Sequence, residues 1–506
     1  MGNILEIHTL AERLKQLKDS QQKIVLCHGC FDFMHPGHIR YFQASKKMGD
    51  ILVVTVTPDR FVDKGPGRPV FNEALRAESI AALSCVDYVA INAWQTAEET
   101  LRLLRPDTYV KGQEFEKLED KTGKIQREAE VVKEIGAELR FTHEIVFSST
   151  ELINQNLFLD IYPEETKAFL NDFSRKHSFH SIVERIDHLK NMRVLLIGDG
   201  IIDEYHYCET MGKSPKSQII VNKYLDHEVF SGGAFAIANH LAGICSEVCL
   251  LSLLGTEDSR EQFVRDSLKP NVRTKFFYRS DGPTTVKKRY INQYQKHKLF
   301  EVNFINDNHV AEDLEEGIIA YLKKEMPKFD LVLVSDFGHG LISQQIIQVI
   351  EQTAAKVAVN AQVNGANAGY NLITKYHRSY FICMDVPEAR LATQDKHSDI
   401  TSIGEKILST TNADHLIITL GAGGSICLIN GGESHHTPAL STKVIDIVGA
   451  GDAFFSYASL CLAQGMPVDL VSFIGNVVGA IAVQIVGNKR PVEKHEVIDF
   501  IRRLLG

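Results

Sequence analysis

Short apolar runs alternate with segments of helical pattern along most of this chain, and this alternation limits the folds that it can adopt. Residues 24–27 (IVLC) have the pattern of a buried strand, 35–49 of a helix and 50–56 (DILVVTV) of a second buried strand. Apolar strands joined by a helix form a βαβ unit, in which the strands run parallel and are covered on both faces. The alternation continues through 72–112. It predicts a small doubly wound parallel sheet, a Rossmann-like α/β domain, over residues 1–158.

A second α/β series begins at RVLLIGDG (193–200) and continues through the apolar runs LVLVSDFGHG, KVAVN and HLIITLGAGG. Two segments, 217–230 and 283–304, alternate apolar and polar residues but have no partner helices, which indicates half-exposed strands. We expect an α/β domain over 191–506 that carries a small β lid. The charged segment 159–190 has no strand pattern, and we expect a helical connector there.

Composition narrows the classes of function. A hydrophobic content of 44% and a charged content of 24% are globular values, and 506 residues exceed what one core usually holds. The formal net charge of −9 offers no basic footprint for nucleic acid or an anionic membrane. We see no secretory signal and no apolar run long enough to span a bilayer. An odd number of cysteines, nine, argues against a disulfide framework, so we expect a cytoplasmic protein.

The segment VLCHGCFDFMHPGHIR (25–40) gathers two cysteines and three histidines, and three kinds of site compete for it. A redox pair needs a cysteine at a helix N-terminus, whereas Cys27 ends a predicted strand. A zinc site made of both cysteines with His35 and His38 would be more crowded than structural zinc sites are. A strand, a glycine, a loop and a helix start instead aim peptide N–H groups at one spot, which suits a phosphoryl group. His35 and His38 share one face of this helix and can donate hydrogen bonds there, although an ordinary helix cap with surface histidines has the same pattern.

The same region resembles a known superfamily. GCFDFMHPGH is similar to the signature of nucleotidylyltransferases, and the stretches DKGPGRPVFNEALRAESIAALSCVDYV and LRPDTYVKG resemble the adenylyltransferase half of bifunctional ADP-heptose synthases. FSSTELI resembles the closing Ser/Thr motif of the superfamily. The resemblance implies catalysis by His35 and His38, with Lys64 holding the triphosphate, although Lys64 and Arg76 also suit exposed surface positions. It implies nucleotide contacts from Gly29, Phe31, Arg76, Lys111, Gly112, Ser149 and Thr150.

The second series contains VIDIVGAGDAFFSYASLCLAQG (444–465), a glycine loop that opens onto a helix. Gly449, Ala450 and Gly451 are small enough for the backbone to approach an anion, so their N–H groups predict an anion hole for a transferring γ-phosphoryl group. Asp452 follows at the helix start, where it could take the proton of an attacking hydroxyl group. The alternative is that Asp452 only offsets the helix dipole.

Further motifs resemble the ribokinase-type sugar kinases over roughly 190–500. GAGDAFFS is similar to their C-terminal signature, and SGGAFAIAN (231–239) to their N-terminal Gly-Gly signature. The resemblance implies a ribokinase-like fold with substrate contacts from Asp199, Asp203, Gly232, Gly233, Asn239, Lys287 and Asp336. It implies nucleotide contacts from Thr419, Gly421, Gly424, Gly449, Ala450, Gly451 and Asn476, and magnesium ligands at Asp385 and Glu388.

Three departures from the resembled families stand out. Asp385 occupies a position where the kinase family usually has Asn, and VNAQVNGANAGYN (359–371) replaces a segment that usually contains Asp-Pro. The order of the two halves is also the reverse of that in the ADP-heptose synthases, whose kinase comes first. These departures bear on the identity of the sugar more than on the type of reaction.

Together the resemblances predict a bifunctional sugar-activating enzyme. An ATP-dependent kinase would phosphorylate a sugar similar to heptose 7-phosphate, and a nucleotidylyltransferase would join a sugar 1-phosphate to an adenylyl group with release of pyrophosphate. We expect Mg²⁺ and ATP at both sites, with CTP as the alternative at the N-terminal site. The other hypotheses are a CTP-dependent enzyme for a polyol or another sugar phosphate, and a chain in which one half is a degenerate nucleotide-binding regulatory module. Lid strands with open edges favour a homodimer.

Overall fold

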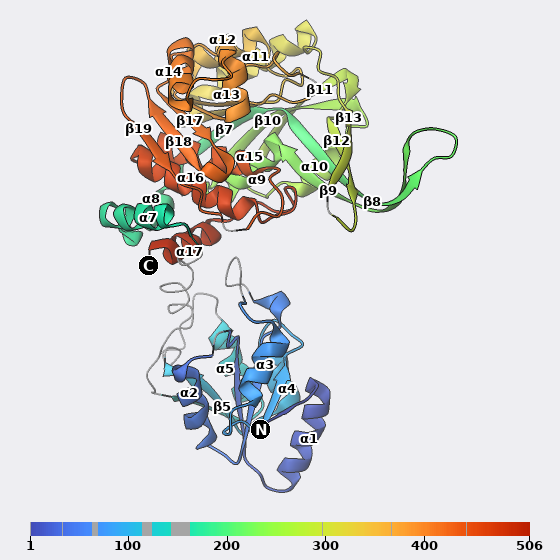
Figure 1. Ribbon diagram of the computed structural model, residues 1–506, viewed down its shortest axis with the longest axis vertical. Helices are drawn as coiled ribbons and strands as arrows, with labels where there is room; N and C mark the ends of the chain where they lie inside the picture. The colour runs from blue at the N-terminus through green and yellow to red at the C-terminus, as the bar shows by residue number, and fades with distance from the viewer. Residues whose placement is uncertain are drawn as a thin grey trace. The chain divides into compact units, whose positions relative to one another are not determined.

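The computed structural model describes residues 2–32, 34–62, 69–113, 124–142, 162–295, 297–365, 367–441 and 443–505. The chain divides into two compact units, Met1–Asp160 and Ile161–Gly506, and each is described by itself below (Figure 1).

The N-terminal unit is built on a six-stranded sheet in which every neighbouring pair runs parallel. The strand order is β1-β4-β3-β2-β5-β6, so β2 lies at the centre between β3 and β5. Its apolar strands are buried on both faces, as parallel strands usually are. The strands are β1 (Asn3–Ile4), β2 (Ile24–Gly29), β3 (Ile51–Val56), β4 (Tyr88–Ile91), β5 (Thr108–Gly112) and β6 (Glu138–Thr142).

Helices cover both faces of this sheet, and each face has its own apolar core. One core joins the sheet to α1 (Ile7–Asp19), α4 (Glu98–Leu104) and α5 (Lys124–Glu134). The other joins it to α2 (Pro36–Lys46) and α3 (Glu73–Ala81). The predicted doubly wound arrangement is therefore confirmed for this unit.

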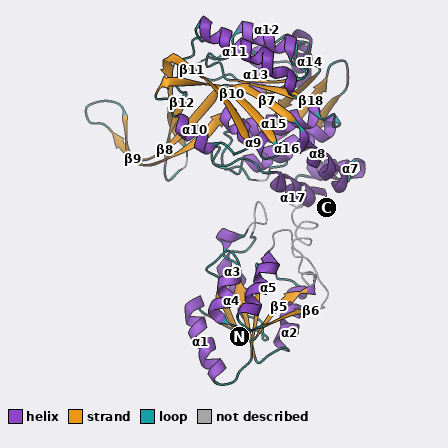
Figure 2. Cartoon of the chain, turned by 180° about the vertical axis from the view of Figure 1, so that it is seen from behind, coloured by secondary structure: helices purple, strands orange, loops and turns teal. Residues whose placement is uncertain are grey.

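The C-terminal unit contains a nine-stranded sheet in the order β11-β10-β7-β14-β15-β16-β17-β18-β19 (Figure 2). Its strands run parallel from β11 to β17, and β18 and β19 then continue antiparallel. The strands are β7 (Arg193–Gly198), β10 (Glu247–Glu257), β11 (Val272–Pro283), β14 (Leu331–Asp336), β15 (Val357–Ala361), β16 (Phe381–Asp385), β17 (His415–Thr419), β18 (Ser425–Ile429) and β19 (Ser434–Thr437).

Two helical layers enclose this sheet, as Figure 1 shows. One layer packs into the large apolar core and consists of α11 (Glu312–Glu325), α12 (Gln344–Thr353), α13 (Val386–Thr393) and α14 (Ile400–Thr411). The other layer contains α9 (Ala234–Ala242), α15 (Ala450–Ala463) and α16 (Val468–Ala482), which are buried along nearly their whole length. The shorter helix α10 spans Glu261–Ser267.

The segment for which we expected a helical connector forms α7 (Glu164–Lys176) and α8 (Phe179–His188), and both helices contact the final helix, α17 (Lys494–Leu505). The ring of Phe173 on α7 stacks on Phe473 of α16, with 4.2 Å between the ring centroids. These helices therefore belong to the C-terminal unit.

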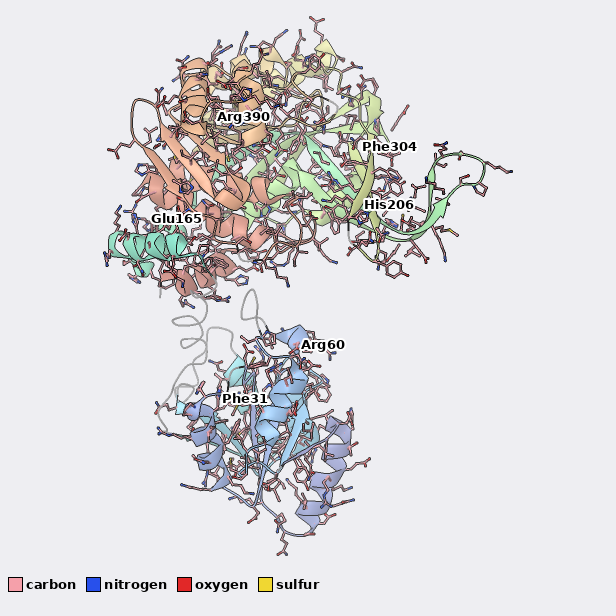
Figure 3. The ribbon with its side chains drawn as sticks, in the orientation of Figure 1. Phe31, Arg60, Glu165, His206, Phe304 and Arg390 are labelled. Atoms are coloured by element: carbon pink, nitrogen blue, oxygen red, sulfur yellow. The ribbon has the colours of Figure 1, made fainter. Side chains whose placement is uncertain are left out.

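A separate four-stranded sheet, which we call the lid, has the order β13-β12-β8-β9. β12 pairs with β8 only as far as Cys208, so the distal parts of β8 and β9 form a two-stranded arm that reaches away from the rest of the unit (Figures 1 and 2). The side chains of His206 and Phe304 mark the lid in Figure 3. Its strands are β8 (Gly200–Lys213), β9 (Ile220–Gly233), β12 (Val286–Asn292) and β13 (Lys298–Phe304).

The predicted fold class is thus confirmed: a Rossmann-like parallel sheet in the N-terminal unit, and an α/β unit with a small β lid in the C-terminal unit. Within the described residues, none of the helices combines the length and the apolar character that a membrane crossing requires. None of the nine cysteines, all of which lie in the described ranges, forms a disulfide bond.

Candidate active sites

The two histidines of the N-terminal motif lie together where β2 gives way to α2. His35 caps the helix, because its Nδ1 accepts a hydrogen bond of 3.1 Å from the backbone N–H of Gly37. Burial lowers the pKa of His35, which favours the neutral ring. A neutral imidazole whose Nδ1 accepts carries its proton on Nε2, so Nε2 is the donor. The rings of His35 and His38 stack with 3.9 Å between their centroids, and the predicted pair is therefore brought together.

A strained residue fixes the surroundings of this pair. Phe31 has φ +48°, a conformation that residues with a side chain rarely adopt. Its ring meets His38 edge-on at a centroid distance of 5.4 Å. A Cβ at Gly29 would lie 2.9 Å from the Phe31 ring, so the end of β2 requires glycine. Backbone strain of this kind is typical of functional sites and supports a site at this end of the sheet.

Lys111 and Gly112 end the neighbouring strand β5. The Lys111 ammonium forms an ion pair of 2.8 Å with Glu128, which also accepts a hydrogen bond from the Tyr109 hydroxyl. Burial, the largest single effect, would raise the pKa of Glu128, but the charge and hydrogen bond of Lys111, together with His28 and the Tyr109 hydroxyl, lower it overall. The lysine that we predicted near the nucleotide is thus held in a buried pair beside β2.

Arg76 connects three segments from inside the unit. Its side chain is only 1% exposed and donates to the carbonyl oxygens of Phe71, Cys30 and Thr57 and to the carboxylate of Asp59. The exposed surface position that we considered for Arg76 is therefore wrong. The remaining predicted residues of this site, Lys64, Ser149 and Thr150, lie outside the described residues.

The competing hypotheses for residues 25–40 gain no support. Burial raises the pKa of Cys27 to about 11, so this thiol is not a reactive thiolate. Within the ranges that the structure describes, no three His, Cys, Asp or Glu side chains are grouped so that they could hold a metal ion.

In the C-terminal unit, a cavity of about 440 Å³ opens between the lid and the carboxyl ends of the central strands. The sequence-predicted residues that line it are Asp203, Gly233, Lys287, Asp385, Glu388, Thr419, Gly449, Gly451 and Asp452. Its other lining residues include Arg289, Asn360, Gln362, Asn364 and Asn488. Ligands of open α/β sheets bind at this edge of the sheet.

The glycine loop reaches the cavity through Gly449 and Gly451. Gly449 has φ +82° and directly precedes α15, and a Cβ at this position would overlap the side-chain amide of Asn488. Nothing lies within 4 Å of the place where a Cβ of Gly451 would stand. The start of α15 is therefore open to the cavity at Gly451, and the N-terminal end of a helix suits an anion.

Asp452 lies in the first turn of α15 and is 6% exposed. Its Oδ1 accepts a hydrogen bond of 2.9 Å from the side-chain amide of Gln362. Burial, and then the charge of Asp203, raise the pKa of Asp452 to about 7. A carboxyl group with a pKa near the working pH is suited to general base catalysis.

Asp385 and Glu388 lie on another wall of this cavity, at the start of α13. They form a capping box in which each carboxylate accepts the backbone N–H of the other residue, at 2.8 and 2.9 Å. Burial and then the charge of Asp385 raise the pKa of Glu388 to about 8, and burial raises the pKa of Asp385. Two acidic side chains on one wall of the cavity suit a magnesium ion, which prefers oxygen ligands and keeps part of its water shell.

The lid supplies cations to the cavity. Arg289 on β12 is bonded to Asp203 on β8 and forms an ion pair of 2.7 Å with Glu301. Lys287, two residues earlier on the same face of the strand, is 7% exposed, and burial lowers its pKa. Gly232 lies directly against Asp203, since a Cβ there would overlap the Asp203 carboxylate.

Several predicted residues lie behind the cavity instead. Asp336 is fully buried and is held by the Tyr376 hydroxyl at 2.7 Å and the Lys375 ammonium at 2.6 Å. Asp199 accepts the backbone N–H groups of Phe337 and His339, and burial and then Asp336 raise its pKa to about 7. Both carboxyl groups support the floor of the site.

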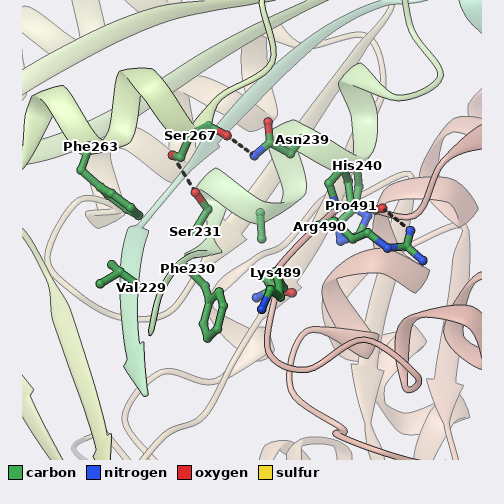
Figure 4. A pocket seen from close by; sticks show the side chains of 12 residues that line it. Val229, Phe230, Ser231, Asn239, His240, Phe263, Ser267, Lys489, Arg490 and Pro491 are labelled. Carbon is green, nitrogen blue, oxygen red and sulfur yellow. Dashed lines mark hydrogen bonds between the residues drawn. The ribbon is translucent and has the colours of Figure 1, made fainter. Parts of the chain in front are cut away.

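Asn239 lines a second, smaller cavity of about 180 Å³ (Figure 4). Its amide is bonded to the carbonyl oxygen of Ser267 and the N–H of Lys269. Asn476 donates to Ser425 and to a backbone carbonyl of its own helix. The other predicted residues outside the larger cavity are Ala450, Gly421 and Gly424.

Sequence reasoning missed Arg289 and Gln362. Arg289 could have been found, because on a half-exposed strand it shares a face with Lys287. Gln362 gives no such signal, since its contact with Asp452 joins residues that are 90 positions apart.

Comparisons with known proteins agree with this geometry. The model of the pfkB family carbohydrate kinases matches residues 193–495, more than half of the chain. The chain belongs to this family. The cytidylyltransferase-like model matches residues 26–155. The protein therefore combines a nucleotidyltransferase unit with a sugar kinase unit, in the order opposite to that in the bifunctional relatives described next.

The relatives include the bifunctional protein HldE of Trichlorobacter lovleyi, 27% identical over 300 residues, or 58% of this chain and 60% of the relative. HldE of Haemophilus ducreyi is 27% identical over 299 residues, with the same two coverages. The match thus spans about 60% of the length of these relatives.

Among solved structures, Arabidopsis thaliana ribokinase complexed with ribose and ATP is 15% identical with a TM-score of 0.47. Thermotoga maritima ribokinase is 17% identical with a TM-score of 0.48. Each comparison covers 62% of this chain and 99% of the other.

Proposed function

We propose that this protein activates a sugar in two steps. The C-terminal unit transfers the γ-phosphoryl group of ATP to a sugar related to heptose 7-phosphate. The N-terminal unit joins a sugar 1-phosphate to a nucleotide, with release of pyrophosphate. The observation that carries the kinase half is the position of Asp452: a buried carboxyl group in the first turn of α15, beside an open glycine loop and within one cavity with Asp385, Glu388 and Lys287.

In the proposed kinase reaction, Asp452 takes the proton of the attacking sugar hydroxyl. The hydroxyl oxygen then bonds to the γ-phosphorus, and the bond from that phosphorus to the β–γ bridging oxygen breaks, which leaves ADP. The N–H groups of Gly451 and Asp452, which line the cavity, stabilise the negative charge of the moving phosphoryl group. Asp385 and Glu388 would hold magnesium, which neutralises charge on the nucleotide phosphates.

In the proposed nucleotidyl transfer, a phosphate oxygen of the sugar 1-phosphate attacks the α-phosphorus of the nucleotide, and pyrophosphate leaves. The Nε2–H of His35 and the ring of His38 would donate hydrogen bonds to the phosphate oxygens as charge accumulates, and the neutral tautomer of His35 and the stacking of the two rings support this role. We favour ATP at this site because of the sequence motifs shared with the adenylyltransferases. The cytidylyltransferase-like family match supports CTP as the second candidate, acting on a polyol phosphate or another sugar phosphate.

The two reactions can be tested separately in the intact protein. Asp452→Asn should lower sugar phosphorylation by about 10²–10⁴-fold and leave pyrophosphate release from a supplied sugar 1-phosphate unchanged. His38→Ala should have the opposite effect. If either folded variant lost both activities, the two sites would not be separate as we propose. A panel of sugar and polyol phosphates with ATP or CTP, read by mass spectrometry, identifies the substrates.

We also propose that the protein forms a homodimer through the lid. The lid carries exposed apolar side chains on β9 and on the edge strand β13, among them Tyr224, Phe300, Val302 and Phe304. An apolar surface of this kind at a sheet edge favours pairing with a second copy. Sedimentation equilibrium of the wild type and of Phe300→Lys measures the expected dimer and its loss.

A further inference from the structure

Gln362 touches the group that we propose as the catalytic base. It follows the end of β15 and lines the cavity. Its side-chain nitrogen Nε2 lies 2.9 Å from Oδ1 of Asp452 and 3.0 Å from Oδ1 of Asn360. Gln362 stands in the segment 359–371, where the sequence departs from the pattern of the kinases that it resembles.

A backbone carbonyl sets the direction of these hydrogen bonds. Asn360 lies 2.9 Å from the carbonyl oxygen of Cys383, and a carbonyl can only accept. Asn360 must therefore turn its NH₂ group to Cys383 and its own amide oxygen to Gln362. Gln362 must in turn present its NH₂ group, which has two hydrogens, one for Asn360 and one for Asp452. Gln362 is thus a donor to Asp452.

The backbone of Gln362 is held on both sides. Its N–H donates to the carbonyl oxygen of Asp336 at 2.8 Å, and its carbonyl oxygen accepts from the side chain of Asn371 at 3.1 Å. These two hydrogen bonds fix the backbone from which the Gln362 side chain extends. Asn371 is itself fixed, because its amide also donates to the carbonyl oxygen of Asp336 at 3.0 Å.

We infer that Gln362 is a positioning residue that donates to Oδ1 of Asp452 and so leaves Oδ2 to face the sugar hydroxyl. This inference rests on the proposed role of Asp452 as the base. Among the residues that the structure describes, Gln362 is the hydrogen-bond donor to this carboxylate, and its donation goes to Oδ1. Because a hydrogen bond holds Oδ1, the substrate proton would be accepted by Oδ2, on the other side of the carboxylate.

The charges around Asp452 explain why such a donor matters. Burial disfavours the ionised form of Asp452, and the charge of Asp203 from β8 disfavours it further. Lys287 from β12 and the Gln362 amide act in the opposite direction. The pKa of Asp452, about 7, is the balance of these effects. Removal of the donor should therefore raise this pKa and leave a smaller fraction of the base ionised at neutral pH.

The experiment is the pH profile of kcat/KM for sugar phosphorylation by the full chain. Gln362→Met has a similar length but no donor, and we expect the acid limb to move upward by about one pH unit, since a hydrogen bond to a charged group is worth at least that much. Gln362→Glu places a carboxylate against Asp452 and should move the limb further in the same direction. At pH values above both limbs, the Met variant should approach the wild-type rate.

A control variant separates this effect from general damage to the cavity. Asn364→Leu changes a lining amide that donates to the carbonyl oxygen of Phe337 and not to Asp452. It should leave the acid limb in place even if the rate falls. An acid limb that is unchanged in both Gln362 variants overturns the inference. If the Asp452→Asn variant keeps its kinase activity, the proposed base is wrong. This outcome is distinguishable from an unchanged acid limb in the Gln362 variants, which overturns only the role of Gln362.

Discussion

The lid and the glycine loop share one carboxylate, Asp446, and this contact gives a prediction that can be worked out in detail. Asp446 accepts hydrogen bonds from the Tyr205 hydroxyl of β8 at 2.9 Å and from the Lys298 ammonium of β13 at 3.0 Å. It also accepts the backbone N–H groups of Val448 at 3.2 Å and Gly487 at 3.0 Å. Val448 directly precedes the glycine loop, so Asp446 joins the loop to two lid strands.

The perturbation is Tyr205→Phe, which removes one hydroxyl group. Tyr205 is only 1% exposed, and a hydrogen bond to a charged acceptor contributes about 1.5–3 kcal/mol. Asp446 keeps three other donors, so we take the lower value of about 1.5 kcal/mol, which is about tenfold in an equilibrium or a rate. Asp446 does not line the cavity, and the effect should therefore reach the reaction through the loop. We expect kcat to fall about tenfold and the sugar KM to stay within about twofold.

Steady-state kinetics of sugar phosphorylation, together with thermal unfolding, test this prediction. Tyr207→Phe is the matched control, because Tyr207 lies on the same strand and its hydroxyl donates to Glu228 at 2.6 Å instead of to Asp446. It should lose stability without a comparable fall in kcat. A Tyr205→Phe enzyme with normal kcat, or one in which only the sugar KM rises, would refute the reasoning that the lid acts on the loop.

Three further predictions follow from single contacts. Gly449→Ala should abolish most kinase activity and lower the melting temperature, because the new Cβ would overlap Asn488. The control is Gly431→Ala: Gly431 also has a positive φ, +69°, but has open space around it, so this variant measures the cost of backbone strain alone. The pKa of Asp199 is raised from 3.8 to about 7, so the folded state binds this proton more tightly, and the free energy of unfolding should fall as pH rises from about 4 to 7, by at most about 4 kcal/mol. Chemical denaturation of the wild type and of Asp199→Asn should show a weaker pH dependence in the variant. Arg76→Met leaves three carbonyl oxygens without their donor and should destabilise the N-terminal unit by about 3 kcal/mol or more, with loss of nucleotidyl transfer and retention of kinase activity.

Much of the fold could be predicted from the sequence, because its strands are short apolar runs with clear ends. Short apolar runs predicted the central strands β2 and β3, and alternating apolar and polar residues predicted the lid strands β9, β12 and β13. Strand β8 was not predicted, since its sequence GIIDEYHYCETMGK is rich in charged and polar residues. It is extended because β9 and β12 pair with it on both sides, and pairing partners far along the chain leave no local signal.

The candidate sites also contain some features that a local sequence motif predicts and others that depend on distant parts of the chain. The glycine loop with Asp452 and the pair His35–His38 are local motifs, and the structure brings their members together. The amide of Asn239, which we assigned to the sugar, is instead hydrogen-bonded to the backbone beside a different cavity. A motif identifies which residues lie near one another, but the contact of each side chain depends on elements that the motif does not contain.

Strand β8 has one more consequence. This one strand runs from Asp203 in the cavity to Lys213 in the arm, and the 14 residues of the whole strand, Gly200–Lys213, span about 45 Å at the usual rise of a strand. A long, thin extension of this kind acts as a lever, so that a slight rotation at its root becomes a large displacement at its tip. A pair of spectroscopic labels, one at the tip and one on the outer helices, would therefore register events at the sugar site without any label near the chemistry.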